Sequence, residues 1–292
     1  MKRHLLSAIA IAAMAVGTAA QAGPVIIDGT DSADHGSFSA GANQAGWEYM
    51  QRALTNLGSS VSGTAAQVVT VIGTDASSQA RNAIASAFSL AGLTGWSINY
   101  VSGSVAINSF MSTLSTTTTG ILYLSTAGLV SGDMDASELA AVNAAAGQIN
   151  TFVSGAGNPA LGGALFAQGE TGTGEFGWLS TLIPGITNTD IGPGGIGTDI
   201  TLTAAGTTAF PGLTNTDLSG ADPWHSWFGG NLGGLSVLGT AADAIGAAGV
   251  QRAVIIGGGA GTRISVPEPG SMVLVATAGL ALLGLRRRRQ SK

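Results

Sequence analysis

Short apolar runs along the chain alternate with longer stretches in which apolar residues recur every three or four positions. The runs are rich in β-branched residues and predict strands at 25–28, 68–72, 96–101, 120–124, 164–167, 235–238 and 253–256. The longer stretches predict helices near 47–57, 80–88, 105–114, 139–153 and 176–183. Because strands and helices alternate, we expect an α/β fold in three layers, with a mostly parallel sheet and helices on both faces.

A few glycine and acidic positions predict where these helices begin and end. Gly58 directly follows the 47–57 stretch, and we expect it to end that helix. Asp135 and Glu138 have the spacing of a capping box, which predicts the start of the helix that includes 139–153. We expect Asp133 and Asp135 to cap a helix rather than to bind a metal. From 169 to 221, glycine and threonine are dense and the pattern weakens.

The residues that follow the first predicted strand carry oxygen-bearing side chains at alternate positions. Asp28, Thr30 and Ser32 lie in the segment Asp28-Gly29-Thr30-Asp31-Ser32, which resembles the D-x-S/T-x-S metal site of von Willebrand A domains. At the carboxyl end of a parallel strand, such a loop could bind Ca²⁺ or Mg²⁺. The alternative is a polar strand-to-helix loop that holds no ligand. No other cofactor is expected.

Only two histidines follow residue 22, and each lies near an acid. Asp34 precedes His35, and Asp222 lies three residues before His225. These pairs allow, in principle, a hydrolase that acts on glycans or esters. However, the chain has no G-x-S-x-G nucleophile elbow, and adjacent residues rarely point in the directions that a triad requires. We therefore expect both histidines to lie in exposed loops, and a non-enzymatic protein is favoured over an enzyme.

An aromatic cluster surrounds the second of these histidines. Trp224, His225, Trp227 and Phe228 lie in a segment bounded by glycines. Aromatic rings beside acids could stack on a sugar ring, which makes Trp224, His225 and Trp227 candidate ligand contacts. The alternative is an apolar cluster that closes the core.

The composition excludes several kinds of chemistry. The chain has no cysteine, which excludes disulfides, a thiolate nucleophile and cysteine-bound metals. Residues 23–266 hold four arginines and no lysine against fifteen acids, so their formal net charge is −11, compared with −5 for the whole chain. This balance argues against nucleic-acid binding, and the missing lysine excludes a Schiff base and a P-loop. Gly192–Gly197 matches G-x-G-x-x-G but follows no predicted strand, so dinucleotide binding is rejected.

The N-terminus has the pattern of a secretory signal peptide. Lys2 and Arg3 precede the apolar run 5–16, as in the basic and hydrophobic regions of such peptides. The small residues Ala20 and Ala22 satisfy the cleavage rule, so we expect the mature chain to begin at Gly23.

The C-terminus contains three parts in a fixed order. Two prolines hold the first part extended, so that a protease could reach it; it consists of Val266, Pro267, Glu268 and Pro269. An uncharged apolar run follows at 272–285, and a helix from 270 to 285 would rise roughly 24 Å, short of the roughly 30 Å hydrocarbon core. The third part is a basic run, which the positive-inside bias keeps in the cytoplasm: Arg286, Arg287, Arg288 and Arg289.

Together these three parts resemble the PEP-CTERM sorting signal of Gram-negative bacteria. The resemblance covers the tail alone. It implies an anchor in the inner membrane and recognition by an exosortase, which cuts near the Pro-Glu-Pro motif. It also implies an association with exopolysaccharide and biofilm matrix.

The order of elements between the two signals is similar to that of a class I glutamine-amidotransferase-like, flavodoxin-like domain. The similarity rests on the strand 121–124, the helix ending at 152–155 before the strand at Ala164, and the segment 210–213. The family's nucleophile would lie just after the strand 164–167, near Gln168-Gly169-Glu170, where there is no cysteine. The resemblance therefore implies the fold without amidotransferase chemistry.

The sequence predicts four parts: a signal peptide at 1–22, an α/β ectodomain at 23–256, a Gly-rich linker at 257–265 and a sorting signal at 266–292. We expect an exported, non-enzymatic protein of the cell envelope or exopolysaccharide matrix. Its ectodomain would face the periplasm from an inner-membrane anchor before reaching the cell surface or extracellular matrix. The alternatives are an exported hydrolase and a divalent-metal-dependent adhesion module.

Overall fold

The computed structural model describes residues 24–61, 65–126, 133–155, 162–170, 174–191, 199–219, 224–243 and 249–258. The predicted signal peptide, the predicted linker beyond 258, the sorting signal and its predicted transmembrane helix lie outside these residues. Within them, no helix is both long enough and apolar enough to cross a membrane.

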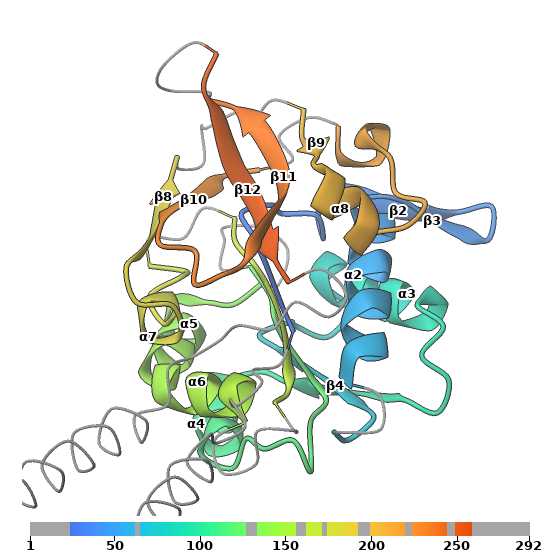
Figure 1. The fold of residues 1–292 in the computed structure, drawn as a ribbon. Helices are drawn as coiled ribbons and strands as arrows, with labels where there is room; N and C mark the ends of the chain where they lie inside the picture. Colours follow the sequence, from blue (N-terminus) through green and yellow to red (C-terminus); the bar gives the residue numbers. More distant parts are fainter. Residues whose placement is uncertain are drawn as a thin grey trace, which may run out of the picture.

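A ten-stranded sheet forms the centre of the described chain (Figure 1). One half of it is parallel, in the order β5-β4-β6-β7-β1. These strands are β1 (Val25–Asp28), β4 (Val68–Ile72), β5 (Ser97–Val101), β6 (Ile121–Leu124) and β7 (Ala164–Gln168). Every residue of β1, β6 and β7 is buried, which explains why their sequences are almost unbroken apolar runs. The expected α/β class and its parallel strands are confirmed.

The other half of the sheet is antiparallel, which the sequence pattern does not predict. β12 pairs with β1 and with both β10 and β11, while β8 and β9 lie further out. The strands are β8 (Ile186–Asp190), β9 (Thr201–Leu202), β10 (Ser226–Gly230), β11 (Ser236–Ala242) and β12 (Gln251–Gly257). β8 is mostly polar and β10 contains two glycines, so neither has the composition of a typical strand.

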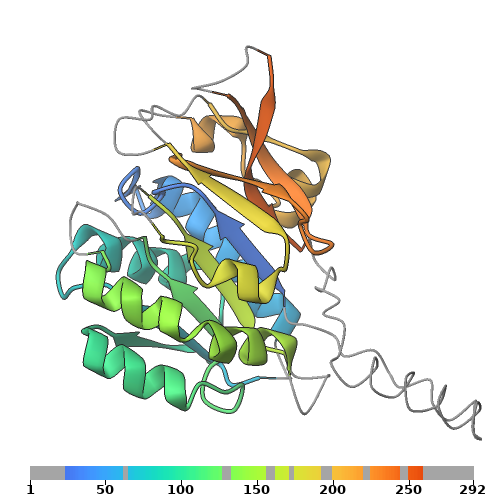
Figure 2. The same ribbon diagram turned by 90° about the vertical axis from the view of Figure 1, so that its left-hand side faces the viewer.

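Helices lie on both faces of the sheet and enclose two separate apolar cores (Figures 1 and 2). One core contains residues of four helical segments: α2 (Gly46–Val61), α3 (Gln79–Leu90), α8 (Ala204–Ala209) and the 3₁₀ helix η1 (Asn215–Leu218). The other contains residues of α4 (Ser104–Ser112), α5 (Ala136–Ala144), α6 (Ala146–Ser154) and α7 (Leu179–Leu182). The described chain is therefore layered as helix, sheet and helix.

A hairpin projects from the body between β1 and α2 (Figure 1). Its strands are β2 (Gly36–Ser39) and β3 (Ala42–Ala45), and its turn places Ala40 and Gly41 at φ values of 52° and 83°. At its base, Gly46 lies so close to the loop after β1 that an added Cβ would be 2.3 Å from the carbonyl oxygen of Ser32. The end of the hairpin thereby packs the chain against the loop after β1.

Two predicted helix boundaries are wrong, and packing explains one of them. Gly58 does not end α2, which continues to Val61; a Cβ on this glycine would be 2.3 Å from a methyl carbon of Leu93, so glycine permits close packing there. The stretch 139–153 is not a single helix, because Ala145 separates α5 from α6. The capping box of Asp135 and Glu138 at the start of α5 is confirmed.

Candidate functional site

The predicted polar residues converge where the parallel strands end. β1, β4, β6 and β7 run in the same direction, so their carboxyl ends lie along one edge of the sheet. The loop 29–35 follows β1, and Glu170 follows β7. His225 joins them from the antiparallel half, where its backbone N–H donates to the Gly29 carbonyl oxygen over 2.7 Å. Segments from both halves of the sheet thus form one polar region.

Asp28, the last residue of β1, is a fully buried carboxylate surrounded by donors. Its Oδ1 accepts from the backbone N–H and the hydroxyl of Thr30, at 3.0 and 2.6 Å. Its Oδ2 accepts from the hydroxyl of Tyr49 at 2.7 Å, and the amide of Gln168 lies 3.5 Å from both oxygens. Burial raises the pKa of Asp28 to about 7, even though these hydrogen bonds favour the charged form.

The three residues of the predicted metal loop lie together, but they bond to one another. The hydroxyls of Thr30 and Ser32 are 2.7 Å apart, and the Thr30 hydroxyl also reaches Asp28. All three side chains are buried. The protein's own donors therefore occupy the Asp28 oxygens that a metal would need, and the assignment of this loop to Ca²⁺ or Mg²⁺ stays a prediction.

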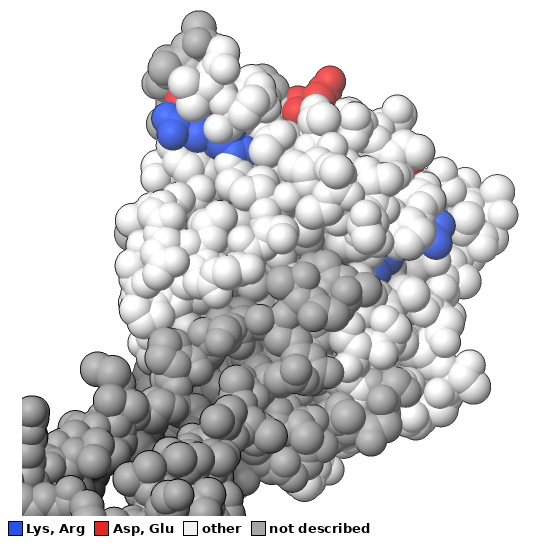
Figure 3. Space-filling model, in the orientation of Figure 1, with Lys and Arg blue, Asp and Glu red and all other residues white. Residues whose placement is uncertain are grey.

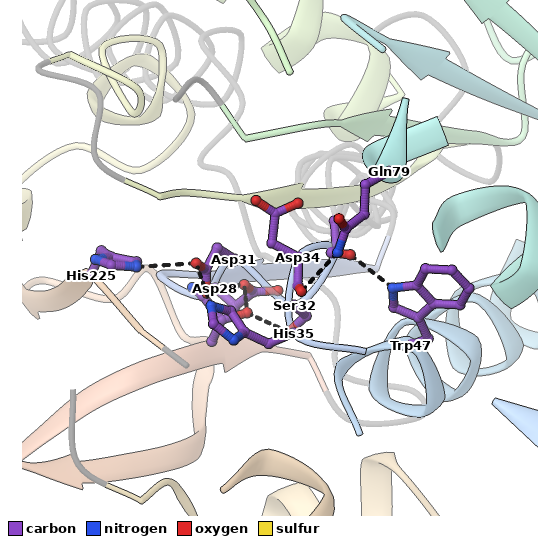
Figure 4. Close-up of polar contacts among 10 residues, drawn as sticks. Asp28, Asp31, Ser32, Asp34, His35, Trp47, Gln79 and His225 are labelled. Atoms are coloured by element: carbon purple, nitrogen blue, oxygen red, sulfur yellow. Dashed lines mark hydrogen bonds and ion pairs between the residues drawn. The ribbon is translucent and has the colours of Figure 1, made fainter. Parts of the chain in front are cut away.

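Asp31 connects the two histidines (Figure 4). Its Oδ2 lies 3.1 Å from Nε2 of His225 and 3.0 Å from Nε2 of His35. Burial by itself would raise the pKa of Asp31, but the hydrogen bonds from His225 and His35 outweigh burial and lower it. The same contact with Asp31 is the main reason why the pKa of His35 is raised.

The expectation of two exposed loop histidines is wrong. His225 is only 5% exposed, because its backbone adjoins Gly29 and its ring contacts the buried Asp31. His35 is half-buried at the base of the hairpin. His35 bonds to Asp31 and not to the adjacent Asp34, whereas Asp222, the acid near His225, lies outside the described residues. The partner that they share, Asp31, lies four residues before His35 and 194 residues before His225.

Three further carboxyl groups gather beside this network. Asp34, Asp133 and Glu170 each have an oxygen within 4.8 Å of the other two. Burial is the largest cause that raises the pKa of each of these carboxyls; nearby negative charges raise them further. In Figure 4 the carboxylate of Asp34 points to the opposite side of the loop from the ring of His35.

The prediction that Asp133 caps a helix is wrong, whereas that for Asp135 is confirmed. The side chain of Asp135 accepts from the backbone of Ser137 and Glu138 at the start of α5. Asp133 instead belongs to the carboxyl cluster and bonds to the side chain of Thr126 beyond the end of β6. Sequence spacing alone placed both residues near the same helix, but only one has its side chain directed to the helix amides.

The aromatic residues of the predicted sugar contact are part of the core. Trp224 is 0% exposed and Trp227 is 9% exposed, and their ring centroids lie 6.0 Å apart in an edge-to-face arrangement. The guanidinium of Arg252 covers the ring of Trp227 at 5.0 Å. In this structure the rings therefore offer no free face for a sugar, and the alternative of a cluster that closes the core describes them.

A small pocket lies against the β1 loop. It has a volume of about 160 Å³ and is lined by Thr30, Ser32, His35 and Asp217, among others. The carboxylate of Asp217 already bonds to the backbone and hydroxyl of Thr214. The pocket is smaller than the roughly 300 Å³ at which sites for drug-sized ligands begin.

Part of this site could have been found from the sequence. Residues that follow parallel strands share an edge, and this rule points to the Asp28 loop and to Glu170. It would also point to Asp133, which lies nine residues after β6. Tyr49 gave no signal, because a tyrosine on a helix is an ordinary core residue. Gln168 was singled out only as the place of a nucleophile that the chain lacks, and not as a partner of Asp28.

Comparison with known proteins identifies the tail. Residues 265–289 match a family model described as the PEP-CTERM protein-sorting motif, which confirms that prediction. Searches among curated proteins and among solved structures find no match for the chain. The motif is the recognition signal for an exosortase, so the chain carries the mark of an exported protein that is sorted at the membrane and processed by that enzyme.

Proposed function

We propose that the chain is a non-enzymatic protein of the cell envelope or exopolysaccharide matrix. A signal peptide, 1–22, directs export, and residues 23–256 face the periplasm as an α/β ectodomain. An exosortase cuts near Val266–Pro269 and releases the ectodomain to the cell surface or matrix. The observation that carries this proposal is the matched sorting motif at 265–289.

Surface composition supports a place in an extracellular matrix. Charged residues make up 9% of the chain, and in Figure 3 the described part of one face carries few of them. Small polar side chains with little charge stay soluble and expose no strong electrostatic patch to nucleic acid.

Part of the strand order supports a flavodoxin-like ectodomain. The run β5-β4-β6-β7 matches the 2-1-3-4 order of such sheets only if β1 is left out of the count, because the fifth position is filled by the N-terminal strand β1 and not by the last parallel strand in the chain. Gln168, Gly169 and Glu170 then occupy the end of the fourth strand, where the amidotransferase nucleophile would lie. The absence of cysteine there supports a binding or structural role.

The hydrolase and adhesion alternatives depend on different residues of the site. For a hydrolase, His35 and His225 both direct Nε2 to Asp31, so one carboxylate orients both rings. For adhesion through the Asp28 loop, the carboxylate oxygens of Asp28 are already hydrogen-bonded. Both alternatives stay predictions, and the sorting role remains the better supported function.

The processing proposal is tested by replacing Pro267, Glu268 and Pro269 together with alanine. Because an exosortase reads this motif, the variant should keep its C-terminal residues while the wild type loses them. Mass spectrometry identifies the C-terminal residue of the wild type and of the variant. Fractionation shows whether each protein lies in the inner membrane or in the medium. Gln290→Ala, outside the matched 265–289, is the control and should be processed normally. Identical C-termini in wild type and triple variant would overturn the proposal.

A further inference from the structure

We propose that Asp34, Asp133 and Glu170 form a binding site for a hard divalent cation, with Ca²⁺ preferred over Mg²⁺. The site lies at the carboxyl edge of the parallel strands, beside the loop after β1. It is distinct from the Asp28-Thr30-Ser32 set, whose hydroxyl and carboxylate oxygens bond to one another.

The distances among the three carboxyl groups fit one calcium ion. Each residue offers an oxygen within 4.8 Å of the oxygens offered by the other two. Ca²⁺ binds oxygen at about 2.3–2.6 Å, so two oxygens on opposite sides of one ion are about 4.6–5.2 Å apart. Mg²⁺ binds at about 2.1 Å and allows at most about 4.2 Å. Separations that all lie within 4.8 Å are compatible with one Ca²⁺ ion. Mg²⁺ is the poorer match because it demands near-ideal octahedral geometry and gives up its water ligands reluctantly.

A buried carboxylate oxygen without a partner points independently to a ligand. Glu170 is only 5% exposed, and no N–H group or hydroxyl of the described residues donates to its Oε2; the hydrogen bond that its carboxyl shares with Asp133 lies within the cluster. One oxygen each of Asp34 and Asp133 is in the same state. Leaving a buried acceptor unpaired costs about 1–3 kcal/mol, more when it is charged, so three such oxygens at one place are unusual without a bound cation.

No arginine of the described chain neutralises this cluster. Arg52 pairs with Glu48, and Arg252 pairs with Asp243. Arg81 donates to the backbone carbonyl of Thr74 and lies over the ring of Tyr100. Adjacent buried carboxylates repel each other strongly unless protons or a cation compensate their charge. A divalent ion supplies that compensation and accepts the unpaired oxygens as ligands.

The kind of donor selects the kind of ion. All three side chains offer carboxylate oxygen, which hard cations prefer, and the chain has no cysteine to favour a soft metal. The nearby imidazoles of His35 and His225 place Nε2 against Asp31, so that atom of each ring is engaged. The donor set therefore favours Ca²⁺ over Zn²⁺ or Cu²⁺.

The test uses the full-length chain purified from membranes in detergent and depleted of metal with EGTA. Calorimetric titration with CaCl₂ should show one ion per chain, with a dissociation constant on the order of 0.1–1 mM, the range of extracellular calcium modules. MgCl₂ should bind at least about tenfold more weakly, because Mg²⁺ dehydrates reluctantly and demands near-ideal octahedral geometry. Absence of calcium binding up to about 10 mM would overturn the proposal.

Isosteric variants locate the site. Glu170→Gln, Asp133→Asn and Asp34→Asn each remove one charge and should weaken Ca²⁺ binding at least about tenfold, because the lost ligand carried formal charge. Asp75→Asn is the matched control, since Asp75 is an exposed acid outside the cluster. Circular dichroism confirms that each variant is folded. Unchanged affinity in the folded cluster variants, or an equal loss in Asp75→Asn, would also overturn the proposal.

Discussion

At the scale of single residues, buried polar groups define the site more than any sequence motif does. Asp28 is held by Thr30 and Tyr49, and Gln168 links Tyr123 to the same place by accepting from the Tyr123 hydroxyl over 2.7 Å. Donors from α2, β6 and β7 thus surround the end of β1. The sequence pointed to Asp28 because it follows an apolar strand. It could not point to Tyr49, whose hydroxyl reaches Asp28 only after the helix has packed.

Tyr49→Phe should destabilise the protein. The change keeps the ring but removes the donor to Oδ2 of Asp28, and both side chains are fully buried. An unpaired buried acceptor costs about 1–3 kcal/mol, so the free energy of unfolding should fall by that amount. Urea titration followed by tryptophan fluorescence measures it. Tyr100→Phe, at a partly exposed ring over Arg81, is the control and should change stability by under about 0.5 kcal/mol. Equal stabilities of Tyr49→Phe and wild type would contradict the predicted role.

At the scale of elements, the contact between the β1 loop and the start of β10 adds a second link between the two halves of the sheet, beside the pairing of β1 with β12. Gly29 accepts from the backbone N–H groups of His225 and Ser226, at 2.7 and 3.2 Å. A Cβ on Gly29 would lie 2.0 Å from the carbonyl oxygen of Ser226. β10 was not predicted, because a five-residue segment with two glycines lacks the composition of a strand. Its place depends on this close backbone approach, which brings His225 to Asp31.

Gly29→Ala should therefore be destabilising, whereas Gly147→Ala should not. The first substitution forces the backbone of β10 away from the β1 loop, an overpacking that costs about 1–3 kcal/mol. The second adds a methyl group in α6 that meets no atom within 4 Å, and the better helix propensity of alanine should add up to about 1 kcal/mol. Thermal unfolding of both variants gives the comparison. A Gly29→Ala protein as stable as wild type would show that the approach is not tight.

At the scale of the whole molecule, charge is distributed unevenly between surface and interior. The surface carries little charge, while several carboxyl groups are buried or half-buried at one edge of the sheet. Burial raises the pKa of Asp28 to about 7 and raises those of Asp34, Asp133 and Glu170. The folded chain therefore holds protons that the unfolded chain has already released. This difference couples the stability of the whole protein to pH.

In EGTA, stability should fall as pH rises from about 4 to about 7. In this window the unfolded Asp28, with an ordinary pKa of 3.8, has lost its proton, while the folded Asp28 keeps it up to about pH 7. The folded state binds more protons, so each such group lowers stability by at most about 1.4 kcal/mol per pH unit. His35, whose pKa is raised by its contact with Asp31, also lowers stability as pH rises, because that contact stabilises the protonated ring; its effect lies at higher pH than that of Asp28. Asp31, whose pKa is lowered, has the opposite effect. Its charged form stabilises the folded protein, and this stabilisation is lost only as pH falls below about 4.

Urea unfolding at about pH 4.5, 6 and 7.5 measures this slope. Asp28→Asn removes one of the titrating groups and should make the slope shallower. Adding Ca²⁺ should raise stability most at the highest of these pH values, because the ion binds deprotonated carboxylates. A stability that is constant or rises across this range would contradict the buried protons.

The sequence by itself determined the parts that depend on local pattern. The strands predicted at 25–28 and 68–72, the strand predicted at 120–124 apart from Gly120, the capping box at Asp135 and the sorting motif are all confirmed. The reason is that apolar period, cap spacing and motif order each depend on a few neighbouring residues. The antiparallel half of the sheet, the burial of His225 and the meeting of Asp34, Asp133 and Glu170 were decided only by tertiary structure. These residues lie up to 194 positions from their partners, and a linear pattern carries no information about which segments will pack together.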